Sequence, residues 1–391
     1  MVALWILAAS AALVAWVYVG YALLLAMLAR LRPRPRKRAA VRTPATVVVP
    51  AHNEEAVIGR KVANVLGGSY PSELVQVVVA SDGSTDRTVE LARAAGAEVL
   101  DLPRSGKVAA LSAAAAHASG EIFVFTDADC FLEHDSLSEL LSNFADPDVG
   151  GVTANEVRHG ARDFGGVSRG EGLYWRYEQW IKRLEDRVGN TVSACGSLYA
   201  VRRSLFDPPT ATAGNDDVLI STEVVRRGKR LAFDEHARIV VGSTKRGSDE
   251  FRRKVRIING GLRTWLARRE LLDPRRHGLY ALEVVSRKIL RRVLPFALLA
   301  LFASSGWLAL TANPLWWILF GPQLLVALLA LAGWSLRGRP AGRRRALWIP
   351  YYFALANVAA GVAVLSLATG SRFEYWKPSG RDDVGLKTPA A

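Results

Sequence analysis

The chain has 391 residues, more than one ordinary domain needs, and half of them are hydrophobic. Its formal net charge is +15, but much of this excess lies beside apolar segments, and there is no zinc-finger spacing or RNA-binding aromatic signature, which argues against a nucleic acid partner. Only Cys130 and Cys195 are present, too few for a disulfide scaffold, and this indicates a reducing compartment.

The first predicted element is a transmembrane helix over residues 1–29. Val2 to Ala29 contains no charged residue, and about 20 apolar residues are enough to cross a hydrocarbon core. A basic juxtamembrane linker follows at residues 30–44, and such positive charge marks the cytoplasmic side. Anionic lipid headgroups are the expected partner of this linker. Its basic residues are Arg30, Arg32, Arg34, Arg36, Lys37, Arg38 and Arg42.

Residues 45–275 are predicted to form a cytoplasmic domain of the α/β class. Short β-branched runs alternate with helical stretches there, which predicts a mostly parallel sheet with right-handed crossovers. Ligands bind such sheets at the carboxyl ends of the strands. The predicted strands are residues 46–49, 75–80, 98–102 and 122–126, and the predicted helices are residues 54–66, 86–95 and 107–118.

Polar residues follow the first two predicted strands. After the first strand, Glu54 could accept hydrogen bonds from ribose hydroxyls or a base edge, or it could only stabilise the start of the next helix. After the second strand, Thr85 or Asp86 can cap the following helix. This leaves Asp82 as a candidate acceptor for a nucleoside.

Asp127-Ala128-Asp129 directly follows the apolar strand at residues 122–126. An extended backbone would turn both aspartates to the same side, and carboxylate oxygens suit Mg²⁺ or Mn²⁺. Lys107 opens a helix, where its ammonium could meet a phosphate or could simply be solvated. The glycines form neither a dinucleotide fingerprint nor a Walker A loop, which argues against an oxidoreductase or a P-loop NTPase.

Two further groups could carry chemistry. Asp216 and Asp217 precede an amphipathic helix. Transfer of a sugar to a hydroxyl needs a base, and a carboxylate is suitable. Asp217 is the preferred candidate for this base, with Asp216 second. A basic segment that includes Arg253 and Arg256 could neutralise a departing diphosphate or face the membrane.

The C-terminal part is predicted to meet the membrane. Residues 276–292 suit an interfacial amphipathic helix, with a solvated helix extension as the alternative. Residues 293–368 contain three membrane segments. The arginines at 337–345 place the loop before the last of these segments inside the cell. If every segment spans, the basic tail 369–391 lies outside, so the last segment either spans or is re-entrant or interfacial. The three segments are residues 293–310, 315–336 and 346–368.

These residues, in this order, resemble the membrane-bound family 2 inverting glycosyltransferases of the GT-A fold. The likeness is to bacterial enzymes similar to cellulose, chitin, hyaluronan and poly-N-acetylglucosamine synthases, and it covers nearly the whole chain. It rests on Pro50 to Glu54, Asp82-Gly83-Ser84, Gly106-Lys107, Asp127-Ala128-Asp129, Ala194-Cys195-Gly196 and Asp216-Asp217.

The resemblance implies a role for each of these positions. Asp127 and Asp129 would contact the diphosphate and the metal, with Asp129 as the more direct ligand and Asp127 nearer the ribose or sugar of the donor, and Asp217 would be the catalytic base. Cys195 and Gly196 would border the sugar pocket. The other donor-binding residues would be Pro50, Asn53, Glu54, Asp82, Lys107, Arg253 and Arg256.

The sequence departs from the processive synthases at one motif. They carry Gln-x-x-Arg-Trp, whereas this chain reads Arg253-Lys254-Val255-Arg256-Ile257 and lacks the glutamine and the tryptophan. Because isoleucine offers no stacking surface for a sugar, repeated extension is not implied. The tryptophan and basic ending of the family correspond to Trp376 to Arg381.

We therefore expect an integral protein of the bacterial plasma membrane that transfers a sugar from a nucleoside diphosphate sugar, with a UDP-sugar as the expected donor and Mg²⁺ or Mn²⁺ as cofactor. The acceptor would be a growing polysaccharide of the exterior or cell envelope, or alternatively a lipid or lipid-linked sugar. Two other classes remain as alternatives: a metal-dependent phosphohydrolase and a non-catalytic membrane sensor. The sequence predicts no sugar identity, linkage or oligomeric state.

Overall fold

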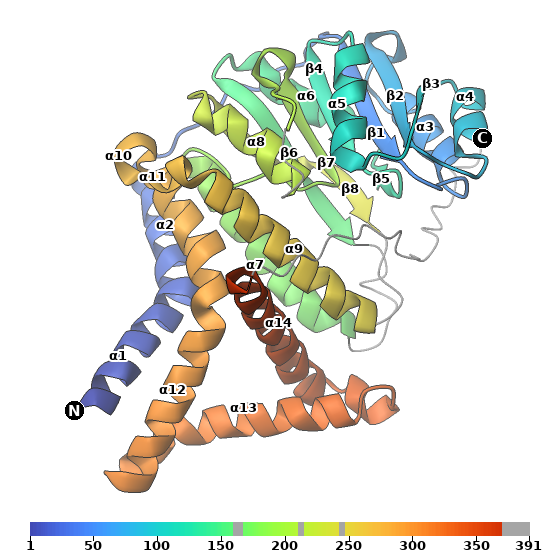
Figure 1. Cartoon of the computed structure of the whole chain (residues 1–391). Helices are drawn as coiled ribbons and strands as arrows, with labels where there is room; N and C mark the ends of the chain where they lie inside the picture. The colour runs from blue at the N-terminus through green and yellow to red at the C-terminus, as the bar shows by residue number, and fades with distance from the viewer. Residues whose placement is uncertain (159–166, 210–214, 242–246, 370–391) are drawn as a thin grey trace. The chain divides into compact units, whose positions relative to one another are not determined.

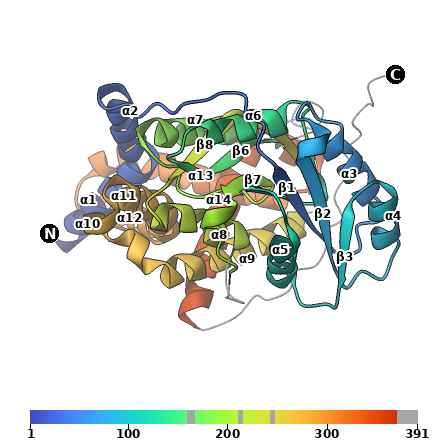
Figure 2. The same ribbon diagram turned by 90° about the horizontal axis from the view of Figure 1, so that it is seen from above.

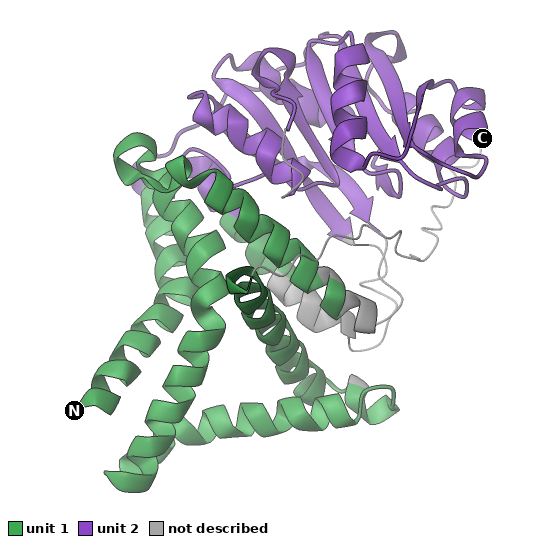
Figure 3. Ribbon diagram, in the orientation of Figure 1, with its two compact units in different colours: residues 1–30, 160–181, 246–375 green, residues 31–159, 182–245, 376–391 purple. Residues whose placement is uncertain are grey.

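The structure is a computed structural model that describes residues 1–158, 167–209, 215–241 and 247–369 and falls into two compact units (Figures 1 and 3). Residues 246–275, expected in the soluble domain, cluster with the apolar helices instead. Unit 1 comprises residues 1–30, 160–181 and 246–375, and unit 2 comprises residues 31–159, 182–245 and 376–391.

Unit 2 is built on an eight-stranded mixed sheet among its described residues, in the order β3-β2-β1-β4-β7-β6-β8-β5. The strands β1 to β4 match the four predicted ones, and the pairs β1-β2, β1-β4 and β2-β3 are parallel, as expected. The strands are β1 (Ala45–Ala51), β2 (Val75–Asp82), β3 (Glu98–Leu102), β4 (Ile122–Thr126), β5 (Cys130–Leu132), β6 (Val149–Arg158), β7 (Leu198–Arg202) and β8 (Arg230–Val241).

Helices cover both faces of this sheet. Figure 2 shows α3 (Ile58–Leu66) and α6 (Ser136–Ser142) on one face, and α5 (Lys107–His117) and α8 (Asp216–Arg226) on the other. Helix α4 (Thr88–Ala94) packs beside β3. The sheet is therefore buried on both sides, which explains why its central strands are apolar runs and do not alternate.

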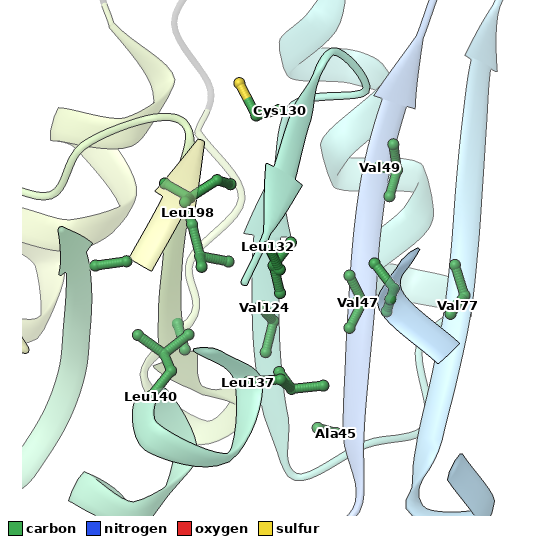
Figure 4. Packing of buried hydrophobic residues seen from close by; sticks show 14 of the residues in the cluster. Ala45, Val47, Val49, Val77, Val124, Cys130, Leu132, Leu137, Leu140 and Leu198 are labelled. Carbon is green, nitrogen blue, oxygen red and sulfur yellow. The ribbon is translucent and has the colours of Figure 1, made fainter. Parts of the chain in front are cut away.

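The core on the α3 and α6 face joins the parallel strands to both helices. Val47, Val77 and Val124 from three strands contact this cluster together with Leu137 and Leu140 of α6 (Figure 4). Val47 and Val124 are fully buried, and complete burial of a valine side chain contributes about 1.5 kcal/mol. The packing fixes the positions at which the strands end.

The linker after the first apolar helix is bound to unit 2 by its own side chains. The Arg36 guanidinium pairs with Asp186 and donates to the Phe233 carbonyl (3.0 Å). Arg38 lies 3.0 Å from the fully buried carboxylate of Asp234. These two arginines are occupied within the domain, so the expectation that the linker serves lipid headgroups does not hold for them.

Unit 1 contains four helices long and apolar enough to cross a membrane, by length and composition, among the described residues. Of the residues expected as a separate interfacial helix, those from Leu279 onward belong instead to one continuous helix, Leu279–Thr311, while the first two end a short helix at His277. Trp16 of the first helix donates from its indole nitrogen to Ser286 of this second helix (3.1 Å). The other two are Pro314–Ser335 and Arg345–Ala368.

These apolar helices are assembled from the following elements. The first contains α1 (Val2–Ala15), a π-helical turn (Trp16–Gly20) and α2 (Tyr21–Leu31); the second contains α11 (Leu279–Val284), a π-helical turn (Val285–Leu290) and α12 (Arg291–Thr311). The others contain α13 (Trp317–Ser335) and α14 (Arg345–Ala368), and α10 (Pro274–His277) precedes α11. Helix α7 (Val167–Val188) contributes residues to both units.

The basic segment expected near a diphosphate lies on α9 (Gly247–Ala267) of unit 1. The apolar side of α9 packs against α14, with Ile258 contacting the small residues around Ala360. Asn259 donates to Ser366 of α14 (2.9 Å). Helix α9 is therefore held to the last apolar helix by both packing and a buried hydrogen bond.

Arg36→Ala should lower the stability of unit 2, because it leaves Asp186 without its closest cation at a site where both side chains are 12% exposed. Removing one partner of a buried pair costs about 3 kcal/mol, or roughly 10 °C in melting temperature. The exposed pair of Arg42 and Glu73 supplies the control, since Arg42 is 75% exposed. Arg42→Ala should shift melting of the purified protein by less than about 2 °C; equal shifts would contradict this account.

Candidate active site

Three parallel strands end at one edge of the sheet, which we call the carboxyl edge: β1 at Ala51, β2 at Asp82 and β4 at Thr126. Their registers place them side by side, with Val48 paired to both Val78 and Phe125. The loops that follow these strands must therefore lie together. Polar loops thus gather at this edge, where parallel sheets bind ligands, and ligand binding there stays a prediction.

The loop after β1 is tied to the loop after β2. Asn53, which follows Pro50, has φ of 56°, a left-handed conformation that asparagine tolerates better than most residues. Its side-chain oxygen accepts from the Thr85 backbone N–H (2.8 Å), and the Glu54 N–H donates to Thr88 (2.8 Å). The Glu54 carbonyl accepts from the Ile58 N–H in a turn that precedes α3, so this helix begins at Ile58 and not at Glu54 as predicted. The donor-binding roles of Pro50, Asn53 and Glu54 stay predictions.

Asp82 already has local partners. Its carboxylate is 2% exposed and accepts from the backbone N–H groups of Ser105 (2.7 Å) and Gly106 (2.9 Å), and from Arg104 (2.9 Å). Asp82 is not part of the helix start, where Asp86 accepts from the Thr88 N–H, and its role as an acceptor for a nucleoside stays a prediction. A nucleoside would have to share Asp82 with the loop that precedes α5.

Lys107 links two acidic elements. Its ammonium lies 3.0 Å from Asp127 and 3.1 Å from Asp216. Burial alone would lower the pKa of Lys107, but the two carboxylates outweigh it and raise the pKa well above its ordinary value. Lys107 is thus a permanent cation at the carboxyl edge and is not a solvated lysine.

Asp127 and Asp129 lie in a turn between β4 and β5, which we call the acidic turn (residues 127–129). The prediction that an extended backbone aligns them is wrong, since β4 ends at Thr126. The turn nevertheless brings their carboxylates and the Cys130 thiol together, with one ligand atom of each within 4.8 Å of the others. Carboxylate oxygens fit Mg²⁺ or Mn²⁺, and the buried thiol is a softer neighbour that the sequence analysis did not include.

Asp217 lies in the first turn of α8, beside the loop that contains Cys195 and Gly196. A Cβ added to Gly196 would lie 3.5 Å from an Asp217 carboxylate oxygen, so the two predicted site regions are adjacent. Glu156 of β6 accepts from the Cys195 thiol and from Ser197, each at 3.0 Å. Glu156 and Ser197 belong to no recognisable sequence motif, so neither was predicted.

Arg253 and Arg256 lie on α9 of unit 1, while the acidic turn belongs to unit 2. Their predicted contact with a diphosphate therefore stays a prediction. The basic ending at Trp376 to Arg381 lies outside the described residues.

Comparisons with known proteins agree with this geometry. The model of the family described as "Glycosyl transferase family 2" matches residues 46–207. The mannosyltransferase PcManGT from Pyrobaculum calidifontis, solved in complex with GDP-Man and Mn²⁺, has a TM-score of 0.65 and 25% identity, and the match covers 91% of this chain and 98% of that one. The fold is therefore GT-A, as predicted, with apolar helices near both ends.

A curated relative matches a shorter region. The 4,4'-diaponeurosporenoate glycosyltransferase of Staphylococcus aureus (strain USA300) is 35% identical over 106 residues, which cover 25% of this chain. The match spans only 28% of the length of that relative. A specific likeness to cellulose or hyaluronan synthases stays a prediction.

Cys195 should react slowly with alkylating reagents although it is only partly buried. Burial and the Glu156 carboxylate raise the pKa of Cys195 to about 12, so the reactive thiolate is about 1,000-fold scarcer at pH 8 than at an ordinary cysteine. We expect iodoacetamide to spare Cys195 in the folded protein and to label it after denaturation, as read by mass spectrometry. Glu156→Gln should speed the labelling, and unchanged labelling would contradict the assigned cause.

Proposed function

We propose that this chain transfers a sugar from a nucleoside diphosphate sugar to an acceptor held at a membrane, since residues 46–207 match the family 2 glycosyltransferase model. The observation that carries the proposal is the convergence of Asp127, Lys107 and Asp216 at the carboxyl edge. Acids and a fixed cation from three elements meet where a parallel sheet binds nucleotides.

Two groups would bind the donor: the pair of aspartates in the acidic turn and Lys107. Asp127 and Asp129 would hold Mg²⁺ or Mn²⁺, which when bound neutralises charge on the leaving diphosphate. Lys107 supplies a second positive charge at the edge, already oriented by its two carboxylates. An oriented charge costs no reorganisation during the reaction, so it stabilises the departing phosphate efficiently.

The base is assigned to Asp217. Asp216 shares its charge with Lys107, so it is committed to the ion pair. Asp217 lies next to Gly196, on the loop that would border the sugar. Its carboxylate would take the proton of the acceptor hydroxyl as that oxygen attacks the anomeric carbon from the face opposite the diphosphate, with inversion.

We propose an apolar or lipid-linked acceptor in preference to a growing polysaccharide. Four helices of spanning length would keep such an acceptor in the bilayer, and the motif around Arg256 lacks the tryptophan of processive synthases. The curated relative named above acts, by its name, on a carotenoid acid. Its partial match supports this choice without deciding the sugar.

We also propose that the catalytic unit faces the cytoplasm. Arg30 and Arg32 lie at the end of the first apolar helix, and Arg337, Arg344 and Arg345 lie between the last two or at the start of the last one. If all four helices span, both basic groups lie on the same side, as the positive-inside rule requires.

The decisive test uses the full chain purified in detergent with Mn²⁺ and a donor panel that includes GDP-mannose and UDP-glucose. We expect release of the nucleoside diphosphate from one donor, and Asp217→Asn should lower that rate about 1,000-fold. The exposed Asp148 gives a matched control, since Asp148→Asn should leave the rate unchanged. Hydrolysis of a phosphate monoester without donor cleavage would support a phosphohydrolase instead, and a function intact in Asp217→Asn would support a sensor.

Chelation of the metal should remove the activity, because the carboxylates of the acidic turn would then repel the negatively charged diphosphate. We expect Mn²⁺ to restore it, and Asp129→Asn to raise the half-maximal Mn²⁺ concentration about 100-fold, a few kcal/mol of lost ligation. Glu133→Gln, just beyond the turn and 46% exposed, should leave the Mn²⁺ titration unchanged. Full activity of the wild type in excess EDTA would refute the metal requirement.

A further inference from the structure

A lysine lies fully buried beneath the acidic turn. The side chain of Lys61, on α3, is 0% exposed, although lysine is among the residues least often buried. Its ammonium donates to the Thr126 hydroxyl (2.8 Å) and to the Cys130 carbonyl. These two residues stand immediately before and after Asp127-Ala128-Asp129, so one ammonium group holds both ends of the turn.

The same helix holds the residues that follow the turn. Asn64 lies three positions after Lys61 and therefore on the same side of α3. Its amide donates to the Leu132 carbonyl (2.9 Å) and accepts from the Leu132 N–H (2.8 Å). Helix α3 thus contacts the chain from Thr126 to Leu132 through hydrogen bonds at three places.

The contact at Thr126 continues to the other side of the site. Thr126 donates its own proton to the Ser197 carbonyl (2.7 Å). Ser197 directly follows Gly196, which lies beside Asp217. A chain of hydrogen bonds therefore runs from Lys61 through Thr126 to the loop that borders the assigned base.

The charge of Lys61 has a desolvation cost. A methionine has similar length and would fill the same space without the cost of burying an ammonium. Lys61→Met would nevertheless leave the buried Cys130 carbonyl without this donor, which lowers stability. Burial lowers the pKa of Lys61 to about 8, while Cys130, Asp127 and Asp129 act in the opposite direction, so the group is charged at neutral pH.

We propose that Lys61 is a positioning residue for the glycosyl transfer: it fixes the acidic turn so that Asp127 and Asp129 are aligned before the donor arrives. The inference rests on the proposed function for its kinetic consequence. Lys61 touches neither donor nor metal in this account. It acts through Thr126 and the Cys130 carbonyl, and its charge offsets the repulsion between the two carboxylates.

The first test compares Lys61→Met with the wild type in the full chain. We expect a 10- to 100-fold lower kcat per folded molecule, the range typical for residues that orient metal ligands, and a lower melting temperature because the Cys130 carbonyl loses its donor. Val65→Ala, a core substitution on the same helix, should also lower the melting temperature but leave kcat per folded molecule unchanged. A Lys61→Met enzyme with wild-type kcat would overturn the proposal.

The second test asks whether Lys61 acts through Thr126. Thr126→Val keeps the shape of the side chain and removes both of its hydrogen bonds. We expect it to lower kcat, and the double variant with Lys61→Met to lose less than the product of the two single losses. Independent, multiplicative losses would overturn the link, and Thr126→Val carries the test if Lys61→Met does not fold.

The third test separates this proposal from the proposed function. Mn²⁺ alone is added to the full chain, and the electron paramagnetic resonance spectrum of the bound ion is recorded. Lys61→Met should alter the spectrum, and Val65→Ala should not. If no donor is cleaved by the wild type, the proposed function fails while this comparison still decides the role of Lys61; an unchanged spectrum in Lys61→Met would overturn it.

Discussion

The parallel pairing of β1 with β2 and β4 is the constraint on which the site depends. In a parallel arrangement every strand ends at the same edge, and burial on both faces favours apolar side chains through the middle of each strand. Val47, Val77 and Val124 satisfy this demand within the core. The first polar residues after each strand are then forced into neighbouring loops, so the chemistry gathers at one edge by topology alone.

The loops at this edge support one another. Asp82 holds the backbone before α5, and Asn53 holds the loop after β2. A side chain at Gly83 would collide with Arg104, since an added Cβ would lie 2.9 Å from its backbone nitrogen. Residues that look from sequence like ligand contacts therefore also determine the shape of the surface that a ligand meets.

The elements that sequence could predict are those with strong local signals. Strands β1, β2 and β4 are largely apolar runs that end in polar residues, and the apolar helices near both ends exceed the length of ordinary core helices. The strands β5 to β8 escaped prediction for physical reasons: β5 has three residues, and β6 contains Gly150 and Gly151, which weaken any strand propensity.

The sequence predicted which residues belong to the site better than it predicted the contacts between them. Asp127, Asp129 and Asp217 are found at the predicted edge, but the pairing of Lys107 with Asp216 joins residues more than 100 positions apart and has no sequence signal. The burial of Lys61 could not be predicted from the sequence either. A lysine between apolar residues of an amphipathic helix normally points to water, and only the tertiary packing of α3 under the acidic turn reverses that expectation.

The Lys107 ion pair bears on the order in which ligands arrive. Asp127 faces an ammonium ion before any donor binds, so a free divalent cation gains less from this carboxylate than it would from a bare one. A diphosphate that arrives with a bound cation would lose less of this electrostatic gain. Its negative oxygens would pair with Lys107, and the cation would bind Asp127. The ion pair between Lys107 and Asp127 would then be replaced by two new ion pairs, Lys107 with the diphosphate and Asp127 with the metal. The site would therefore favour binding of the metal and the nucleotide together over binding of either alone.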